Sequence, residues 1–425
     1  MAWAGAVGAD DLPRPIVDDD YLPVSEAEAR LGQLLFYDRV LSGNRNIACS
    51  TCHHPRFGTS DGLSLGLGEG GKGLGPDRVP DPANLPEQLI PRNSPALFNL
   101  GHRDIRVMFH DGRIETDDSL PSGFRTPLGE DMAAGFSGLL SAQTMFPVLS
   151  ADEMAGHYGE NDISVAVRQG LITGPGGAWD LISDRVASIP EYARMFEAVY
   201  PEIAAGRPIG FTDISNAIAV FIAFEWRSDD SPFDAVLRGE ADFSDAAAAG
   251  FALFSGQAGC IDCHSGPLLT DQRFHAMAEP QLGPGKAARF ETHREDHGRF
   301  RVTGQAADLH AFRTPSLRNV SATGPWGHAG AFSDLADYLR HHADPSGGVA
   351  TSPILPDLAA ARPVFGLPDE QVEAIRAARV RPTRPLTKAE VAALMAFLDT
   401  LTDPTALYGR LGVPDAVPSG LPVDR

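Results

Sequence analysis

The segment IACSTCHHP (residues 47–55) holds two cysteines three positions apart, followed directly by a histidine. The segment GCIDCHSG (259–266) repeats this arrangement, and the chain has no cysteine outside these two segments. In a Cys-x-x-Cys-His motif both thiols add to the vinyl groups of a heme, and the histidine becomes the proximal ligand of its iron. The two segments therefore predict two covalently bound c-type hemes. The attachment residues are Cys49, Cys52, Cys260 and Cys263, and the proximal ligands are His53 and His264.

Three other interpretations of the cysteines stay open. A zinc site formed by both pairs would leave the two histidines without a role. A redox dithiol in each pair is typical of a βαβ context, which the sequence lacks. Each pair is also compatible with a structural disulfide. Heme attachment is favoured because it accounts for the histidines as well as the thiols.

The two motifs also bear on the location of the protein. Attachment of c-type hemes takes place outside the cytoplasm, so the motifs predict a periplasmic protein. The first residues, MAWAGAVGADD (1–11), resemble the end of a secretory signal peptide but lack its charged start and full apolar stretch. We expect residues 1–20 to be a remnant of such a peptide or a disordered N-terminus.

The composition is that of a soluble globular protein. The 425 residues suffice for two or three domains, and 43% of them are apolar. No apolar run approaches the length of a membrane-spanning helix, so we expect no membrane span. The formal net charge of -21 argues against nucleic acid as a partner, because phosphate binding needs a basic face.

The spacing of apolar residues predicts a mainly α fold with few strands. Helices are expected over residues 25–38, 211–227, 244–254 and 386–401. The first and the last begin with capping boxes, formed by Ser25 with Glu28 and by Thr387 with Glu390. Thr212 is the expected N-cap of the second helix.

The two halves of the chain echo each other. In each half a helix ends, a Cys-x-x-Cys-His motif follows, and a loop rich in Gly and Pro leads to an Arg-Asn segment. These segments are PRNSPALFN (91–99) and FRTPSLRNV (312–320). We therefore expect two related domains, 21–209 and 210–410, with a C-terminal tail at 411–425.

A set of motifs runs through most of the chain, from about residue 25 to residue 405. It comprises LGQLLFYDRVLSGNRNIACSTCH, RNSPALFN, FHDGR, SPFD, AGCIDCHSGP, FRTPSLRNV and GPWGHAG. These motifs resemble those of the bacterial diheme cytochrome c peroxidase and MauG superfamily. The resemblance implies two cytochrome c-like domains related by pseudo-twofold symmetry, one heme in each, and a calcium ion between them. In that family the N-terminal heme meets hydrogen peroxide, and the C-terminal heme exchanges electrons with a donor.

The resemblance also bears on the far side of the first iron. Resting peroxidases of the family fill that position with the histidine of a Ser-x-Gly-His-Gly stretch. The matching stretch here is SLGLG (64–68), with Leu67 in place of the histidine. Because leucine cannot bind iron, we expect an open, five-coordinate iron as in MauG, unless water or a histidine from a neighbouring loop fills the position. His54 is expected to be a loop histidine.

Peroxide cleavage needs a base that takes the first proton and delivers it to the leaving oxygen. The family uses the Glu of a Glu-Met pair, with a Pro six residues before it and a Gln ten before it. Glu153, followed by Met154, has Pro147 and Gln143 at those spacings. The resemblance implies Glu153 as acid and base and Gln143 as the group that orients the oxygen ligand. Taken alone, this stretch is typical of an ordinary helix N-terminus.

The far ligand of the second heme is Met in the peroxidases and Tyr in MauG. The matching position here is His342, with His341 as the alternative, although a helix dipole alone also favours histidines at this helix end. Imidazole in place of a thioether lowers the potential of a heme. This change favours a MauG-like cycle, in which the diferric enzyme meets peroxide directly.

Other site residues follow from the same resemblance. Arg313 and Arg318 are expected to pair with heme propionates. Trp326 and His328, in GPWGHAG, are expected to border the second heme, with Trp326 in core packing rather than in electron relay. His110 stands where the family has a Trp between the hemes. Imidazole is harder to oxidise than indole, which puts relay through this position in question.

Calcium in the family is held mostly by carbonyl oxygens and waters, plus one Asn. The matching positions are Asn93, Thr323 and Pro325. The loop 113–143 looks longer than the family usually has. Two roles are open for it, a lid over the peroxide channel and plain surface decoration.

The sequence thus predicts a periplasmic peroxidase that reduces hydrogen peroxide at the His53 heme and receives electrons through the other heme. The electron donor is expected to be a small protein, a cytochrome c or a cupredoxin, and the chain a monomer or homodimer. A MauG-like enzyme that oxidises residues of a partner protein is the alternative within the same fold. A diheme electron carrier with no open iron and a zinc-binding structural protein are the alternatives that are not enzymes.

Overall fold

Helices dominate the computed structural model, which describes residues 12–283, 295–356 and 367–425. The start of the expected signal-peptide remnant lies outside the described residues. The helices up to residue 225 are α1 (Glu26–Tyr37), α2 (Cys49–Cys52), α3 (Leu139–Gln143), α4 (Asp162–Arg168), α5 (Ala178–Ala187), α6 (Pro190–Val199), α7 (Pro201–Ala204) and α8 (Phe211–Glu225). The later ones are α9 (Pro232–Leu237), α10 (Asp245–Ser255), α11 (Phe300–Thr303), α12 (Leu335–Ala343), α13 (Asp369–Ala377), α14 (Lys388–Asp399) and α15 (Pro404–Tyr408).

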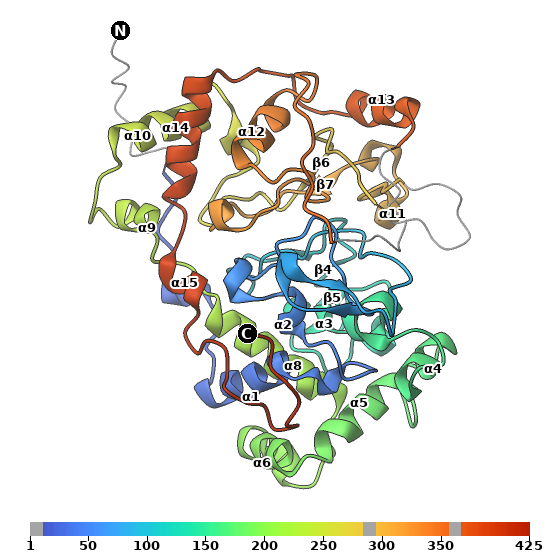
Figure 1. Cartoon of the computed structure of the whole chain (residues 1–425). Helices are drawn as coiled ribbons and strands as arrows, with labels where there is room; N and C mark the ends of the chain where they lie inside the picture. The colour runs from blue at the N-terminus through green and yellow to red at the C-terminus, as the bar shows by residue number, and fades with distance from the viewer. Residues whose placement is uncertain (1–11, 284–294, 357–366) are drawn as a thin grey trace.

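These helices form two lobes, α1 to α8 in one and α9 to α14 in the other (Figure 1). Each lobe has a hydrophobic core of its own. The expectation of a mainly α fold is confirmed. No helix within the described ranges combines the length and the apolarity needed to cross a bilayer.

The four helices expected from apolar spacing are α1, α8, α10 and α14, and their ends test the expected caps. The side chain of Thr387 caps α14 as expected. Ser25 makes no capping hydrogen bond at α1, so that expectation is wrong. Thr212 is not a cap either: α8 begins after Gly210, whose backbone N–H donates to the Asp213 carboxylate at 2.8 Å.

The two cores are built around the same kind of helix pair. In the first, α1 packs on α8, and a Cβ on Gly32 would stand 1.9 Å from the carbonyl oxygen of Ala217. In the second, α10 packs on α14, and a Cβ on Gly250 would stand 2.0 Å from the carbonyl oxygen of Ala393. Only glycine permits backbones to approach so closely. The shared geometry supports the duplication that the sequence predicts.

An asparagine in the left-handed backbone region closes each helix pair. The backbone N–H of Asn99 (φ 58°) donates to Trp226 at the end of α8, and that of Asn319 (φ 63°) donates to Leu401 after α14, both at 3.0 Å. Both side-chain amides then donate to Ser228, which lies between the lobes, at 2.8 and 2.9 Å. Asn tolerates a positive φ better than most residues. Asn99 and Asn319, which occupy equivalent positions in the two lobes, therefore meet at Ser228 in the segment that connects the lobes.

The boundary between the lobes differs from the one expected near residue 210. Helix α8 supplies the apolar face that covers α1, so it belongs to the first core, and the chain enters the second lobe only after Trp226. The C-terminal segment then returns to the first lobe, where Ala406 and Val417 are buried (Figure 1). The residues expected to form a tail are thus part of the first core.

The strands are short and pair in antiparallel fashion. One sheet pairs β1 (Gly71–Lys72) with β2 (Val79–Pro80), and another pairs β6 (Phe274–His275) with β7 (Phe312–Arg313). The third sheet has three strands, in which β4 (Ile114–Thr116) lies between β3 (Val107–Met108) and β5 (Phe124–Arg125). Strands β4 and β5 lie in the long loop 113–143. Ile114 and Phe124 from these strands are buried in the first core, so this loop is more than surface decoration.

Candidate functional site

The histidines of the two Cys-x-x-Cys-His motifs have the same surroundings. The Nδ1 atom of His53 lies 3.0 Å from the carbonyl oxygen of Thr59, and that of His264 lies 3.2 Å from the carbonyl oxygen of Leu269. A carbonyl only accepts, so Nδ1 carries the proton in each ring and leaves Nε2 as the atom able to bind a metal. Burial lowers the pKa of both rings, in His264 to about 4, which keeps them neutral.

The cysteines of the two motifs lie in different lobes. Cys49 packs against the first core and Cys260 against the second. Burial raises the pKa of Cys49 and Cys52 to about 12 and that of Cys260 to about 11, which opposes the thiolate form that zinc binds. Among the described residues the two pairs form no common cluster. This arrangement argues against a shared zinc site.

Leu67 lies in an apolar cluster. Its side chain is 1% exposed and packs with the buried side chains of Leu65 and Leu89. The next residue, Gly68, lies directly against the segment that carries the predicted acid and base. A Cβ on Gly68 would stand 2.3 Å from the carbonyl oxygen of Asp152 and 3.0 Å from the Cα atom of Glu153. The SLGLG stretch and the backbone of Glu153 are therefore in direct contact.

Gln143, Pro147 and Glu153 belong to three consecutive short turns. Gln143 ends α3, Pro147 opens a 3-10 turn (Pro147–Leu149), and Glu153 lies in a π-helical turn (Ala151–Ala155). Such π turns are frequent at functional sites. Burial raises the pKa of the Cys52 thiol, and the carboxylate of Glu153 is close enough to add to this rise. The structure thus brings Glu153 near the first motif.

His342 faces the second motif from α12. The low pKa of His264 has burial as its largest cause and repulsion from His342 as its second. The two rings therefore lie near each other. The Nδ1 atom of His342 lies 3.2 Å from Glu279 Oε1 and 3.3 Å from the Tyr338 hydroxyl. His341 instead directs Nε2 to the carbonyl oxygen of Ala278 at 3.3 Å. These contacts favour His342 over His341 as the far ligand.

Sequence reasoning missed the two partners of His342. Glu279 is 6% exposed, accepts a hydrogen bond from the Tyr338 hydroxyl at 3.0 Å, and has its pKa lowered to about 2. Although burial opposes ionisation, the hydrogen bond and charge of His342 outweigh it. Tyr338 precedes His342 by one helical turn and was detectable from spacing. Glu279 lies far away in the sequence and left no such signal.

His110 and His328 meet in a buried cluster between the lobes. His110 Nε2 lies 3.3 Å from Asp296 Oδ2, and the rings of His110 and His328 are 5.6 Å apart. The His328 ring also stacks on Phe312 at 3.4 Å and hydrogen-bonds to Arg92, which itself pairs with Asp296. The sequence analysis named the two histidines but missed Arg92 and Asp296, which have no motif of their own.

Comparison with known proteins identifies the family. The family described as "Di-haem cytochrome c peroxidase" matches residues 26–242, which is more than half of the chain. The chain belongs to this di-haem cytochrome c peroxidase family. Membership implies two c-type hemes, and the buried Cys, Cys and His sets fit that group because each offers a neutral His with Nε2 available.

Several relatives of this chain are known. The methylamine utilization protein MauG of Methylorubrum extorquens is 29% identical over 337 residues, 78% of this chain and 72% of that protein. Cytochrome c551 peroxidase of Pseudomonas aeruginosa is 28% identical over 330 residues, 77% of this chain and 74% of that protein. A crystal structure of a MauG-like protein associated with microbial copper homeostasis superposes with a TM-score of 0.61 at 26% identity and covers 96% of this chain and 97% of that one.

The two arginines predicted to pair with heme propionates behave differently in this family member. Arg313 is buried, donates only to backbone carbonyls, and has no carboxylate partner among the described residues. Burial lowers its pKa to about 10. Arg318 instead forms a buried ion pair with Asp234 at 2.8 Å and donates to the carbonyl oxygen of Pro267. Arg313 therefore fits a heme propionate, whereas Arg318 is occupied in holding α9.

The remaining predicted residues lie where the two lobes meet. The Asn93 amide donates to the carbonyl oxygen of Pro325 at 3.0 Å, and Thr323 lies two residues before that proline. The calcium site stays a prediction. The Trp326 indole donates to the carbonyl oxygen of Val320 at 2.8 Å and packs against the second core, as expected for core packing.

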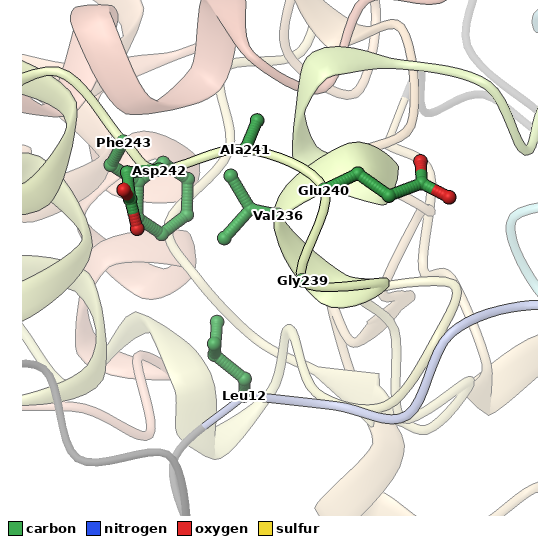
Figure 2. A pocket seen from close by; sticks show the side chains of 7 residues that line it. All are labelled: Leu12, Val236, Gly239, Glu240, Ala241, Asp242 and Phe243. Atoms are coloured by element: carbon green, nitrogen blue, oxygen red, sulfur yellow. The ribbon is translucent and has the colours of Figure 1, made fainter.

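A surface hollow lies apart from all of these residues. It is bordered by Leu12, by Val236 of α9 and by the segment 239–243 that follows this helix (Figure 2). No cysteine or histidine borders it. The hollow therefore takes no part in the site described above.

Proposed function

We propose that this chain is a periplasmic peroxidase that reduces hydrogen peroxide to water, H2O2 + 2 H+ + 2 e- → 2 H2O, beside the His53 heme. Leu67 carries this proposal. It is a buried apolar side chain at the position where other members of the family place a histidine ligand. Neither Leu67 nor its neighbours Leu65 and Leu89 offers a donor atom, which leaves one face available to peroxide.

The residues of the chain handle the protons of this reaction. When bound, the first heme supplies the iron that reduces the O–O bond, and the second supplies electrons. Glu153 takes a proton from one oxygen of peroxide and returns it to the other, which leaves as water. Gln143 orients the bound peroxide through its amide. The close packing of Gly68 on residues 152–153 fixes the backbone that carries Glu153.

A second function, MauG-like oxidation of residues in a partner protein, is favoured by the pair of His342 and Glu279. A carboxylate that accepts from Nδ1 makes the imidazole a stronger donor and stabilises the oxidised form of a metal. Such a second heme is suited to hold an oxidising equivalent for a protein substrate rather than an electron for peroxide. The electron donor is a cytochrome c or a cupredoxin in the first function.

Spectra of the as-isolated ferric protein test the open position. We expect one high-spin and one low-spin heme, and a change of the high-spin signal on addition of peroxide. Two low-spin hemes that ignore peroxide would instead identify an electron carrier. The variant Leu67→His should turn the first heme low-spin, because it restores the histidine of the family. Leu65→His, a change in the same apolar cluster two residues away, should leave the first heme high-spin.

Turnover separates the two enzymatic functions. A peroxidase oxidises ferrocytochrome c or a reduced cupredoxin with two electrons consumed per peroxide. A protein oxidase leaves these donors unused and modifies side chains of its partner, which mass spectrometry detects. If the first heme is open but the protein shows neither of these activities, both proposed functions are contradicted.

A further inference from the structure

We propose that Glu87, Asp152 and His157 form a binding site for a divalent transition-metal ion, with Zn2+ as the ion that fits the donors. One carboxylate oxygen of Glu87, one of Asp152 and a ring nitrogen of His157 all lie within 4.8 Å of one another. The three residues come from separate segments: the loop before β3, the π-helical turn (Ala151–Ala155), and the turn before α4. This site is separate from both Cys-x-x-Cys-His motifs.

The environment of His157 is the observation that points to a ligand. The residue is 8% exposed, and its Nε2 atom is buried with no hydrogen-bond partner. A buried polar atom of this kind is costly unless something binds it. The other ring nitrogen, Nδ1, lies 3.3 Å from Glu160 Oε1. A carboxylate on one ring nitrogen with the other directed to a metal is the usual arrangement of a metal-binding histidine.

Glu160 is itself held in place. Its Oε2 atom accepts hydrogen bonds from the Asn44 amide at 2.6 Å and from the His157 backbone N–H at 2.8 Å. These contacts fix the carboxylate that orients the His157 ring. Asp152 is fixed through its backbone, because its carbonyl oxygen accepts from the Glu69 N–H at 2.8 Å. Of the three residues, Glu87 is the exposed one, Asp152 is half-buried and His157 is buried.

The donor set selects the class of ion. One imidazole and two carboxylates suit Zn2+ and similar first-row ions, whereas Ca2+ and Mg2+ prefer oxygen alone. Three protein ligands leave a position for water. A second group of donors, Cys263, Asp271 and His275, does not qualify, because Cys263 is an attachment thiol and His275 Nε2 already bonds to Asp271 at 2.8 Å.

Zn2+ itself is the probe, and the holoprotein with both hemes is the sample. After treatment with a chelator, calorimetric titration with Zn2+ should show one site per chain. Crystals soaked in Zn2+ should give an anomalous peak at the zinc edge between Glu87, Asp152 and His157. Both readouts are independent of peroxide turnover, so they can fail or succeed separately from the proposed peroxidase function.

Two variants and a control complete the test. His157→Gln should weaken Zn2+ binding by at least about tenfold. Glu87→Gln changes an exposed side chain, so it should fold normally and also weaken binding. His275→Gln removes a histidine from the other group and should bind Zn2+ like the wild type. The proposal is overturned by an anomalous peak elsewhere, by no binding at all, or by equal affinity in wild type and Glu87→Gln.

Discussion

The proposed proton transfer depends on a single side chain, that of Glu153. It is half-buried and is carried by a π-helical turn against which Gly68 packs. Its neighbours on the chain are no substitutes, because Asp152 points to Glu87 and His157 and Met154 is buried in the first core. In the proposed function the carboxylate at this one position is therefore the group that moves the protons of peroxide.

Glu153→Gln keeps the shape of this side chain but removes the base. We expect both hemes to remain bound and the bimolecular reaction with peroxide to slow on the order of 100-fold. Stopped-flow spectra of the ferric protein measure this rate. Glu130→Gln, in the long loop 113–143, is the matched control and should react at the wild-type rate. A wild-type rate in Glu153→Gln would remove Glu153 from the mechanism.

With His342 as the proposed far ligand, Glu279 would act on the second heme through the His342 ring. In Glu279→Gln the ring loses an anionic acceptor, so the ferric form is less stabilised and the reduction potential should rise by about 60 mV or more. Spectroelectrochemical titration measures the potential. Tyr338→Phe retains the carboxylate and removes only the hydroxyl, so its shift should be smaller. Equal potentials in wild type and Glu279→Gln would exclude a role of this carboxylate in tuning the heme.

At the scale of elements, the glycine contacts decide how each helix pair packs. Gly32 and Gly250 each lie against a carbonyl oxygen of the facing helix, so an added methyl group must push the helices apart. The same close approach occurs in both lobes, where α1 packs on α8 and α10 packs on α14.

Gly250→Ala should therefore destabilise the protein despite the better helix propensity of alanine. Overpacking costs about 1–3 kcal/mol, which exceeds the gain of about 1 kcal/mol from propensity. Urea unfolding followed by far-UV circular dichroism measures the free energy of unfolding. Gly138→Ala serves as the control, because a Cβ there meets nothing within 4 Å. Equal free energies of unfolding for Gly250→Ala and the wild type would show that α10 and α14 can move apart without a loss of stability.

At the scale of the whole molecule, the C-terminal segment fastens the first lobe after the chain has completed the second. The buried Glu225 carboxylate at the end of α8 accepts from the backbone N–H groups of Arg410, Leu411 and Gly412. Near the chain end, Asp424 accepts from Arg39 and from Thr51, inside the first heme motif. The first lobe is therefore stabilised by segments from both ends of the chain.

Removal of residues 411–425 should loosen the first lobe and spare the second. The deletion leaves Glu225 without two of its donors and exposes the surface that Val417 covers, a loss of about 2 kcal/mol or more. Hydrogen exchange should increase in α1 and α8 but not in α10 and α14. Arg425→Ala removes an exposed ion pair with Asp415 and hydrogen bonds to the carbonyl oxygens of Pro414 and Asp415, all local to the tail, so this variant should exchange like the wild type. Uniform exchange across both lobes of the truncated protein would contradict this account.

Much of this protein could be read from local patterns. The Cys-x-x-Cys-His motifs and the long amphipathic helices each occupy a short stretch of chain, and such signals do not depend on tertiary contacts. The roles of Gln143, Pro147 and Glu153 stay a prediction from the family resemblance. The expected cap at Thr212 was wrong because α8 already begins after Gly210, whose N–H donates to the Asp213 carboxylate. Ser25 does precede α1, but its side chain makes no capping hydrogen bond.

Only the tertiary structure decided which segments meet. The lobe boundary, the return of the C-terminus, the Glu279 partner of His342 and the separate ties of Arg313 and Arg318 all join residues far apart in the chain. A charged or polar group that is removed from water needs a partner, and an apolar group needs a surface to cover. Which group serves depends on what lies nearby in the fold and not on the distance along the sequence. The sequence by itself therefore determined the chemistry of two heme sites, and folding determined which side chains surround each of them.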